Sequence, residues 1–373
     1  MPPLLIDVRA ADDPRDVVHR GAQALAEGKL VVFPTETVYG LAARALDADA
    51  VARLLEVKGR KEGHPLTLAI RSAVEAWDYA PDLSPLAQRL ARRCWPGPIT
   101  LVVDDSHPES LVRRLPPSVQ RAVSPRQTLG LRVPGHPTVL DVMKMVVGPL
   151  VLTSANRGGR AEAQIAQQAI AALGDDVDLV LDDGPTRYGQ PSSVVRVSGK
   201  EFEVLRVGAV PERTLKRLAG VVILFVCTGN TCRSPMAEQL CRQILAERLG
   251  CAPADLEDRE VQAASAGMAA MPGGGATEEA ISVMANLGLD LRHHVTQPLT
   301  EAVVRHADVI FTMTRAQRQG IVTEWPDAAE RTRVLAASGT DIPDPIGGPL
   351  ERYQRCAEQI QDELRIQLGQ LDL

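Results

Sequence analysis

The sequence predicts two α/β domains in series: an N-terminal domain with a mixed twisted sheet and a C-terminal doubly wound domain with a parallel sheet. Three observations lead to this prediction. The chain has 373 residues, and at roughly 100–200 residues per domain that length suggests two domains with separate cores. Apolar runs of strand length alternate with amphipathic runs of helix length in both halves. The pattern breaks around residues 207–220 and restarts sharply after them.

In the first half, short apolar runs that end in polar loops predict strands, and stretches with apolar residues every three or four positions predict helices. The predicted strands cover residues 29–37, 65–70, 99–104, 128–134, 150–156, 177–184 and 192–197. The predicted helices cover residues 47–59, 84–94, 137–146 and 161–173. Because helices separate only some of these strands, we expect a mixed sheet.

Residues 207–220 lose the strand pattern and carry a short, charged, helical segment. We place the domain boundary there, with a first domain over 1–210, a linker over 211–220 and a second domain over 221–373. Further strands are predicted over residues 221–226, 260–267, 307–314 and 332–337. Helices are predicted over residues 234–249, 277–288, 315–325 and 351–368. Regular alternation of strands and helices predicts a parallel sheet with helices on both faces.

The composition argues against several classes of protein. With 45% hydrophobic and 24% charged residues, the chain is typical of a folded, soluble protein. Aromatic residues make up 3%, which argues against a surface that stacks successive bases. A net charge of -6 argues against a polyanion-binding surface but not against a local basic cleft.

Targeting and metal signals are missing from the sequence. No apolar run approaches the roughly 20 residues that span a bilayer, and the first residues lack the pattern of a secretory signal. The six cysteines have neither the spacing of a disulfide framework nor that of a zinc site. We therefore expect a cytoplasmic protein with no membrane partner and no metal site.

The sharpest motif lies at residues 226–238, where Cys227, five further residues and Arg233 stand between a predicted strand and a predicted helix. This geometry aims consecutive backbone N–H groups and a helix N-terminus at one point, which makes an anion site. Those donors and Arg233 stabilise a thiolate, so Cys227 is predicted to be a nucleophile near neutral pH. The residues between them form the predicted phosphate-binding loop (residues 228–232, hereafter the phosphate loop): Thr228, Gly229, Asn230, Thr231 and Cys232.

Three more side chains complete the predicted catalytic set. The planar fork of Arg233 can bind two phosphate oxygens and follow them into the transition state. Ser234 can donate a hydrogen bond to the cysteine sulfur and ease its departure in a second step. Asp344 lies on a loop rich in proline and glycine, where a mobile carboxylate can close over the phosphate loop and act as the general acid.

These residues resemble those of the low-molecular-weight protein phosphatase family, over nearly all of residues 221–373. The resemblance implies that the cysteine attacks phosphorus to give a phosphocysteine, that the Asp-Pro loop donates the proton, and that the partner is a phosphorylated protein. It extends to residues 265–267, whose serine braces the loop asparagine in the family, here Asn230.

Thr231 is predicted to select the substrate. Tyrosine-directed members of the family usually carry a bulky aliphatic residue at this position and aromatic residues after Asp-Pro, whereas Ile346, Gly347 and Gly348 follow here. Both features, together with residues 291–300, look like the bacterial protein-arginine phosphatase branch. A threonine hydroxyl can meet a polar guanidinium, whereas an aliphatic wall favours a phenyl ring. Phosphoarginine is therefore the first predicted substrate and phosphotyrosine the second. If Thr231 only packs the loop, phosphotyrosine or small aryl phosphates are alternative substrates.

The cysteines other than Cys227 can be explained as ordinary packing residues. Cys232 either traps an oxidised Cys227 as a reversible disulfide or is a small buried residue. The remaining cysteines are predicted to be packing residues: Cys94, Cys241, Cys251 and Cys356.

The first half has no Walker motif and no GxGxxG loop, but polar clusters fall at its predicted strand ends. Each cluster alone is a weak signal, because a threonine-rich turn or a Lys-x-Arg is usually only surface. The clusters cover residues 33–42, 58–66, 95–103, 131–137, 153–159, 191–195 and 205–208. Their joint order resembles the threonylcarbamoyl-AMP synthase family (Sua5/YciO/YrdC-like), over nearly all of residues 10–210.

This second resemblance implies a reaction and its substrates. The family condenses L-threonine, bicarbonate and ATP into threonylcarbamoyl-AMP and pyrophosphate, the first step toward the threonylcarbamoyl group of tRNA adenosine 37. It implies ATP as a substrate, with Mg²⁺ only as the partner of ATP and no dedicated metal or organic cofactor. It also implies double-stranded RNA binding, with tRNA or tRNA-modification enzymes as partners.

The candidate residues suit that chemistry. Four cations can neutralise a triphosphate and the charge that builds up as a carbamate attacks the α-phosphorus: Lys58, Arg60, Arg132 and Arg206. Ser154 and Asn156 match the Ser-x-Asn pair that contacts nucleotide in the family, and Ser192 begins a Ser-Ser pair where the family commonly has Ser-Thr. Thr35 or Thr37 is expected to help hold the amino acid. Ala69 stands where the family usually has a histidine.

The sequence thus predicts a fusion enzyme with two activities. The alternative is a phosphatase whose first half is a catalytically inactive module that binds nucleotide or RNA.

Overall fold

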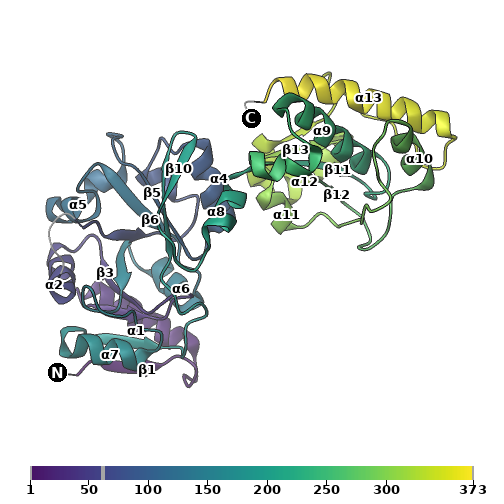
Figure 1. Cartoon of the computed structure of the whole chain (residues 1–373). Helices are drawn as coiled ribbons and strands as arrows, with labels where there is room; N and C mark the ends of the chain where they lie inside the picture. The colour runs from purple at the N-terminus through teal and green to yellow at the C-terminus, as the bar shows by residue number, and fades with distance from the viewer. Residues whose placement is uncertain (1, 60–63, 372–373) are drawn as a thin grey trace. The chain divides into compact units, whose positions relative to one another are not determined.

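The computed structural model describes residues 2–59 and 64–371. The chain divides into two compact units, Met1–Leu215 and Lys216–Leu373, coloured purple to teal and green to yellow in Figure 1. The division falls inside helix α8 (Glu212–Ala219), which occupies most of the span predicted as a linker. None of the helices in the described residues is long and apolar enough to cross a bilayer.

Unit 1 is built on a mixed sheet of ten strands within the described residues, in the order β1-β8-β2-β3-β7-β4-β6-β5-β9-β10. The sheet contains both parallel pairs, such as β4 with β6, and antiparallel pairs, such as β3 with β7, which confirms the predicted mixed sheet. The strands are β1 (Leu4–Asp7), β2 (Val31–Phe33), β3 (Gly40–Arg44), β4 (Thr67–Ala69), β5 (Ile99–Asp104), β6 (Thr128–Arg132), β7 (Leu150–Ser154), β8 (Leu179–Asp182), β9 (Ser193–Ser198) and β10 (Glu201–Arg206).

Helices connect these strands, and their ends follow from local sequence. Asp47 caps α2 by accepting the backbone N–H groups of Asp49 and Ala50, and Gly59 ends that helix in the left-handed conformation that glycine adopts without strain. Lys58 therefore lies in the last turn of α2. The helices are α1 (Pro14–Ala26), α2 (Ala48–Lys58), α3 (Ala76–Tyr79), α4 (Pro85–Cys94), α5 (Pro117–Val123), α6 (Pro137–Met145) and α7 (Ala166–Leu173).

The sequence patterns missed or misplaced some elements of unit 1. The helix predicted from residue 161 begins only at Ala166, because the preceding segment is extended and the carbonyl of Ala163 accepts the backbone N–H of Tyr39 at 2.8 Å. Strand β10 was not predicted, since it is a mostly exposed edge strand with several charged residues. Strand β3 was missed because glycine and alanine supply most of it, and these residues give little strand signal.

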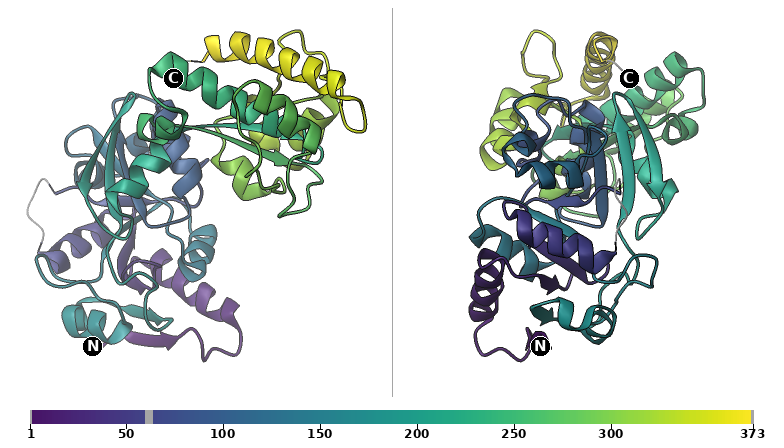
Figure 2. Two further views of the ribbon diagram at one scale, coloured as in Figure 1. Left: turned by 45° about the vertical axis from the view of Figure 1, so that its right-hand side comes forward. Right: turned by 90° about the vertical axis from the view of Figure 1, so that its left-hand side faces the viewer.

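Unit 2 holds a parallel sheet of four strands in the described residues, in the order β12-β11-β13-β14. The strands are β11 (Val221–Cys227), β12 (Val261–Gly267), β13 (Val309–Thr312) and β14 (Thr332–Val334). The helices are α9 (Arg233–Leu249), α10 (Glu278–Asn286), α11 (Glu301–His306), α12 (Arg315–Glu324) and α13 (Leu350–Gly369). Helix α13, yellow in Figures 1 and 2, lies beside α9.

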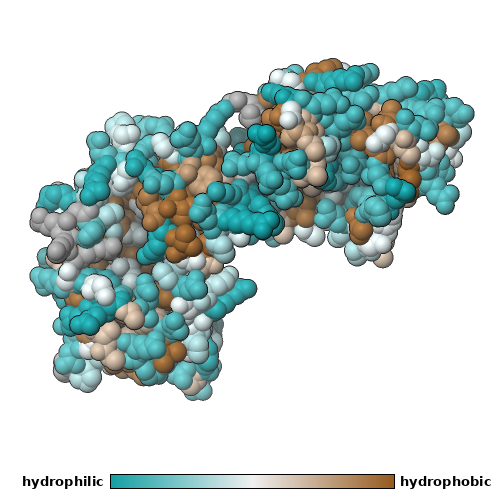
Figure 3. Space-filling view, viewed as in Figure 1, coloured by the Kyte–Doolittle hydropathy of each residue, from teal (hydrophilic) through white to brown (hydrophobic). Residues whose placement is uncertain are grey.

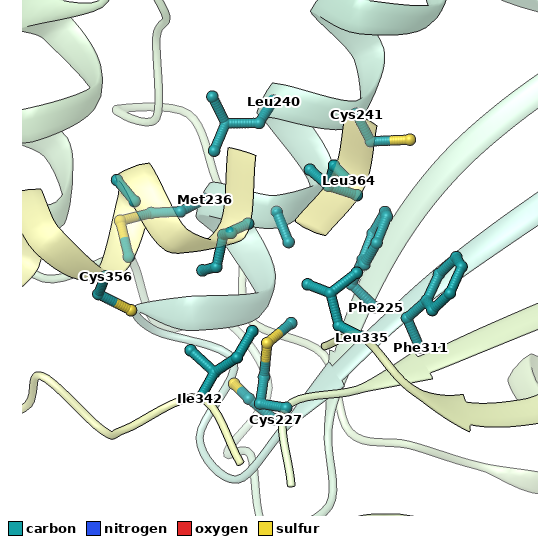
Figure 4. Packing of buried hydrophobic residues seen from close by; sticks show 14 of the residues in the cluster. Phe225, Cys227, Met236, Leu240, Cys241, Phe311, Leu335, Ile342, Cys356 and Leu364 are labelled. Carbon is teal, nitrogen blue, oxygen red and sulfur yellow. The ribbon is translucent and has the colours of Figure 1, made fainter. Parts of the chain in front are cut away.

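The two faces of the central strand β11 pack into different apolar clusters, as a doubly wound sheet requires. Ile223, Phe225 and Cys227 belong to one cluster together with residues of α9, α10 and α13. Leu224 and Val226 belong to the other, with residues of α11 and α12. Figure 4 shows the first cluster, in which Cys227 lies at one end, near Ile342. The predicted parallel, doubly wound sheet is therefore confirmed.

Candidate active sites

A cavity of about 890 Å³ opens in unit 1 between the strand ends of the sheet and helix α2. Part of its wall is apolar and comes from Val102, Val194 and Leu205; Figure 3 shows apolar residues, in brown, gathered over the strands labelled β5, β6 and β10 in Figure 1. The polar lining of the cavity includes Arg160 and Glu162, and also residues that the sequence singled out: Thr35, Lys58, Arg132, Ser154, Asn156, Ser192 and Arg206. A cavity lined by both apolar residues and cationic groups suits a ligand that carries a base as well as negative charge.

Lys58 is almost fully buried, with 5% of its surface exposed. Its Nζ donates to the Ser154 carbonyl at 2.7 Å and to Asn156 Oδ1 at 3.0 Å, and it also donates to the Asn156 carbonyl. Ser154 Oγ in turn donates to Asn156 Oδ1 at 2.5 Å. The lysine thus fixes the turn that follows strand β7 and places a cation at the cavity floor.

Arg132 forms a buried ion pair with a residue that the sequence did not single out. Its Nη2 lies 2.7 Å from Glu36 Oε1 and donates to Thr37 Oγ1 at 2.8 Å, while Glu36 Oε2 accepts the Gly135 N–H at 2.8 Å. Thr35 Oγ1 and Thr37 Oγ1 lie 2.8 Å apart. Glu36 therefore orients the guanidinium and offsets part of its charge, so Arg132 presents less net charge to the cavity than a lone arginine would.

Arg206 lies at the end of strand β10 and also lines the cavity. Its Nη2 donates to the Ser192 carbonyl at 2.8 Å and to Ser192 Oγ at 3.2 Å, and Thr100 Oγ1 is 2.9 Å from the same hydroxyl. Burial lowers the pKa of Arg206 from its ordinary value, and neighbouring Arg132 lowers it further, while Glu162 opposes both. A guanidinium that is desolvated in this way gains from an anionic ligand.

In unit 2, the phosphate loop is closed by one asparagine. Asn230 has a φ of 56°, a left-handed conformation that asparagine tolerates better than most residues. Its Nδ2 donates to Ser234 Oγ and to Ser265 Oγ, both at 2.9 Å, and its Oδ1 accepts the Gln297 N–H at 2.9 Å. The loop therefore keeps its shape without a ligand.

The Cys227 sulfur faces two donors inside that loop. The backbone N–H of Asn230 donates to Cys227 Sγ at 3.2 Å, and Ser234 Oγ lies 3.0 Å from the sulfur. Ser234 Oγ accepts from Asn230 and also lies 3.3 Å from the Ala266 carbonyl, so its single hydroxyl proton can point to that carbonyl or to the sulfur. Both contacts stabilise a thiolate.

Arg233 is buried and leaves one donor unused. Its Nη1 donates to the Ile342 carbonyl at 3.1 Å and its Nη2 pairs with Asp344, while its buried Nε has no hydrogen-bond partner among the described residues. Asp344 is more open, with 42% of its side chain exposed. A buried donor without a partner costs free energy until it is satisfied, which an anion in the loop would do.

The described cysteines are free thiols. Cys232 is buried, with its sulfur 3.5 Å from Thr277 Oγ1 and 3.6 Å from the Tyr353 hydroxyl. Burial raises the pKa of Cys356 to about 12 and that of Cys241 well above its usual range. Those two thiols are therefore kept neutral, as packing residues are.

Comparison with known proteins identifies both units. A family model described as telomere recombination (Sua5, YciO, YrdC) matches residues 23–208. A putative threonylcarbamoyl-AMP synthase of Mycobacterium tuberculosis is 37% identical over 202 residues, which cover 53% of this chain and 87% of that protein. The chain belongs to the threonylcarbamoyl-AMP synthase family. A second family model, low molecular weight phosphotyrosine protein phosphatase, matches residues 222–372, so the synthase domain is fused to a phosphatase domain.

Other relatives extend the synthase match. The threonylcarbamoyl-AMP synthase of Pyrococcus abyssi is 35% identical over 199 residues, 53% of this chain, and the chain spans only 56% of the length of that relative. The crystal structure of P. abyssi Sua5 complexed with L-threonine is 25% identical, with a TM-score of 0.52 over 70% of this chain and 92% of that chain. Both units are thus enzyme domains of known types.

The structure brings most of the predicted site residues together. In the synthase domain, Thr37 lies next to the cavity through its contacts with Thr35 and Arg132, and Arg60 lies outside the described residues. In the phosphatase domain, Cys227, Asn230 and Ser234 are joined by side-chain contacts, and Arg233, which precedes Ser234 in the chain, pairs with Asp344. Thr231 is half-buried, and its carbonyl accepts the Thr277 N–H at 3.0 Å.

Several residues of the two sites were missed by sequence reasoning. Glu36 and Glu238 lie inside the segments 33–42 and 226–238, which the sequence analysis singled out. The sequence does not indicate which side chain each carboxylate contacts. Glu238 accepts from Ser265 Oγ at 2.7 Å, and burial raises its pKa. His294 Nε2 lies 2.8 Å from the Asn230 carbonyl, and Gln317 contacts Thr228. Gln317 forms a capping box with Thr314 at the start of helix α12, so its Thr-x-x-Gln spacing was the signal that could have marked it.

Proposed function

We propose that the synthase domain makes threonylcarbamoyl-AMP and pyrophosphate from L-threonine, bicarbonate and ATP, and that the phosphatase domain dephosphorylates proteins through a phosphocysteine. The observation that carries the first activity is the convergence of Lys58, Arg132 and Arg206 on one cavity with Ser154 and Asn156. The observation that carries the second is Cys227 within reach of two donors in a preformed loop. The crystallised Pyrococcus relative bound to L-threonine supports the choice of amino acid.

The synthase reaction needs positioned charge more than proton transfer. The amine of threonine and bicarbonate combine to a carbamate with loss of water. A carbamate oxygen then attacks the α-phosphorus of ATP, the bond to the β-phosphate oxygen breaks, and pyrophosphate leaves. Lys58 and Arg206 stabilise the charge on the phosphates, and the apolar wall at Leu205 receives the base. Mg²⁺ enters only bound to ATP, and the adenylate passes to the enzymes that modify tRNA.

The full chain is expected to release pyrophosphate from ATP only when both L-threonine and bicarbonate are present. Omitting either substrate should reduce the release by about 10²-fold or more, because no carbamate forms to attack phosphorus. A coupled pyrophosphate assay checks this, with L-serine as the control amino acid. ATP binding by calorimetry without any release would instead favour the inactive nucleotide- or RNA-binding module.

The phosphatase reaction runs in two balanced steps. The Cys227 thiolate attacks phosphorus, the bond from phosphorus to the leaving nitrogen or oxygen breaks, and Asp344 donates a proton to the leaving atom. Water then attacks the phosphocysteine, Asp344 takes its proton, and inorganic phosphate leaves. Ser234 donates to the departing thiolate sulfur. Arg233 holds the equatorial oxygens, with its unpartnered Nε as one of the donors.

Phosphoarginine is the substrate that we propose for this domain. Thr231 is half-buried on the phosphate loop and carries a hydroxyl that can meet a guanidinium. The exposed apolar residue that follows the Asp-Pro pair is aliphatic: Ile346, two residues after Asp344, is 58% exposed, and Gly347 and Gly348 come next. None of these residues offers the ring that would stack on a phenyl leaving group.

Thr231→Ile is expected to shift the ratio of phosphoarginine to phosphotyrosine hydrolysis about 10-fold toward phosphotyrosine, because an apolar branch replaces a hydroxyl beside the leaving group. Paired peptides that differ only in the phosphorylated residue give kcat/KM for both. Thr323→Ile, on the exposed side of helix α12, is the matched control. If the parent already prefers phosphotyrosine, the assignment to phosphoarginine is wrong.

A further inference from the structure

Gln317 joins helix α12 to the phosphate loop through a buried side chain that uses each of its polar atoms. It is 7% exposed. Its Oε1 accepts the backbone N–H groups of Met313 at 3.0 Å and Thr314 at 3.1 Å. Its Nε2 donates to Thr228 Oγ1 at 3.1 Å. Thr228 follows the nucleophile directly in the chain, and it is exposed.

The orientation of this amide is fixed by its partners. Backbone N–H groups can only donate, so the atom that faces Met313 and Thr314 must be the amide oxygen. The NH₂ group therefore faces Thr228, and the Thr228 oxygen must act as the acceptor in that contact. A hydroxyl has one proton to donate, and here that proton is left free to point elsewhere.

The free proton determines what kind of group the hydroxyl can bind. A phosphoryl group is a pure acceptor, whereas the nitrogens of a guanidinium leaving group are donors. The backbone of Thr228 is also held, because its carbonyl accepts the Ala269 N–H at 2.9 Å. The residue is thus restrained on both its main chain and its side chain, at the position next to Cys227.

We propose that Thr228 is a further substrate-binding residue whose hydroxyl donates to a phosphoryl oxygen, and that Gln317 is the positioning residue that keeps this proton available. The inference rests on the phosphatase activity proposed above. It assigns a role to a side chain in a loop that otherwise binds phosphate through backbone N–H groups, and to a residue on a helix outside the loop. It predicts an effect on every phosphorylated substrate, unlike Thr231, which distinguishes the leaving groups.

Thr228→Val in the full chain is expected to lower kcat/KM about 10-fold for phosphoarginine and phosphotyrosine peptides alike, and to weaken competitive inhibition by inorganic phosphate by a similar factor, since one hydrogen bond to a charged group is lost. Thr228→Ser should restore most of both. If Thr228→Val stays within about 2-fold of the parent in both measurements, the hydroxyl binds only water and the proposal is overturned.

Gln317→Glu separates positioning from packing. The glutamate keeps the oxygen that caps Met313 and Thr314, but its second oxygen accepts the Thr228 proton instead of donating to Thr228. We expect a loss of about 10-fold that largely disappears when Thr228 is already valine, so that the double-mutant cycle shows coupling. Gln319→Glu adds the same charge on the exposed face of the same helix, where Gln319 donates to Thr323, and is the matched control. Equal losses in the parent and Thr228→Val backgrounds would show a charge or folding effect and would overturn the positioning role.

Calorimetric binding of inorganic phosphate gives a readout that does not depend on catalysis. If the parent hydrolyses neither peptide, the proposed phosphatase function fails. Weaker phosphate binding by Thr228→Val would then still support the contact, and unchanged binding would overturn it.

Discussion

Cys227→Ser is expected to abolish phosphatase activity, by on the order of 10⁴-fold in kcat, as removal of a covalent nucleophile typically does. A serine hydroxyl at this position is far less acidic than a thiol, and the two donors at 3.0 and 3.2 Å from the sulfur do not suffice to ionise it. The loop itself should keep its shape, because the Asn230 side chain is held by Ser265 and Gln297, and a serine oxygen can still accept the Asn230 backbone N–H. Phosphate should therefore still bind.

Two controls make this result specific. Cys251→Ser changes a partly buried free cysteine outside the phosphate loop and should leave hydrolysis unchanged. Threonine-dependent pyrophosphate release by the Cys227→Ser chain should also stay at the parent level, which reports that the rest of the chain is folded. Residual hydrolysis within about 10-fold of the parent would rule out the phosphocysteine route.

The phosphatase loop could be predicted closely because its chemistry is local. Cys227 and Arg233 are separated by five residues, so a strand end and a helix start place them without help from the rest of the chain. The bracing of the loop is not local. Ser265 and Gln297 contact Asn230 from 35 and 67 residues away, and only the resemblance pointed to the serine. Gln317 has a local signal, the capping box that it forms with Thr314, but that pattern predicts only the start of helix α12 and not the contact with Thr228, 89 positions away.

In the synthase site, by contrast, the functional residues come from distant parts of the chain. Its residues were predicted from the order of weak motifs, and the fold then assembles them from distant segments: Lys58 contacts Ser154 across 96 positions, and Arg132 contacts Glu36 across another 96. The cations could be predicted from the motifs, but Glu36, the acid that orients Arg132, could not. Pairing across a mixed sheet depends on strand order, and that order was not predictable here because β1, β3 and β10 were missed. Ala69, by contrast, is fully buried in an apolar cluster with Phe33 and Leu152 and does not line the cavity.

Lys58→Met is expected to lower threonine- and bicarbonate-dependent pyrophosphate release by about 10³-fold, close to what removal of one preorganised donor from a transition-state site costs. Methionine keeps the length and apolar stem of lysine but loses the ammonium, so the site loses a cation and the turn at Ser154 and Asn156 loses the bonds that orient it. Because both effects act on ATP, we expect a lower kcat together with weaker ATP binding. Lys29→Met, an exposed lysine paired with Glu27 in the same unit, is the matched control and should change neither.

The phosphatase activity of the same variant reports on folding of the rest of the chain. The carbonyls of Ser154 and Asn156 would lose a partner, which costs about 1–3 kcal/mol for each buried group that stays unsatisfied, so a lower melting temperature of unit 1 is expected. Substitution by arginine keeps the charge but not the fit, because a planar fork cannot replace a compact ammonium among three closely spaced oxygens. Lys58→Arg should therefore restore part of the ATP affinity without restoring the rate.

If Lys58→Met instead keeps the parent rate while the domain melts at a lower temperature, Lys58 serves only to hold the turn, and the catalytic charge must come from Arg132 and Arg206.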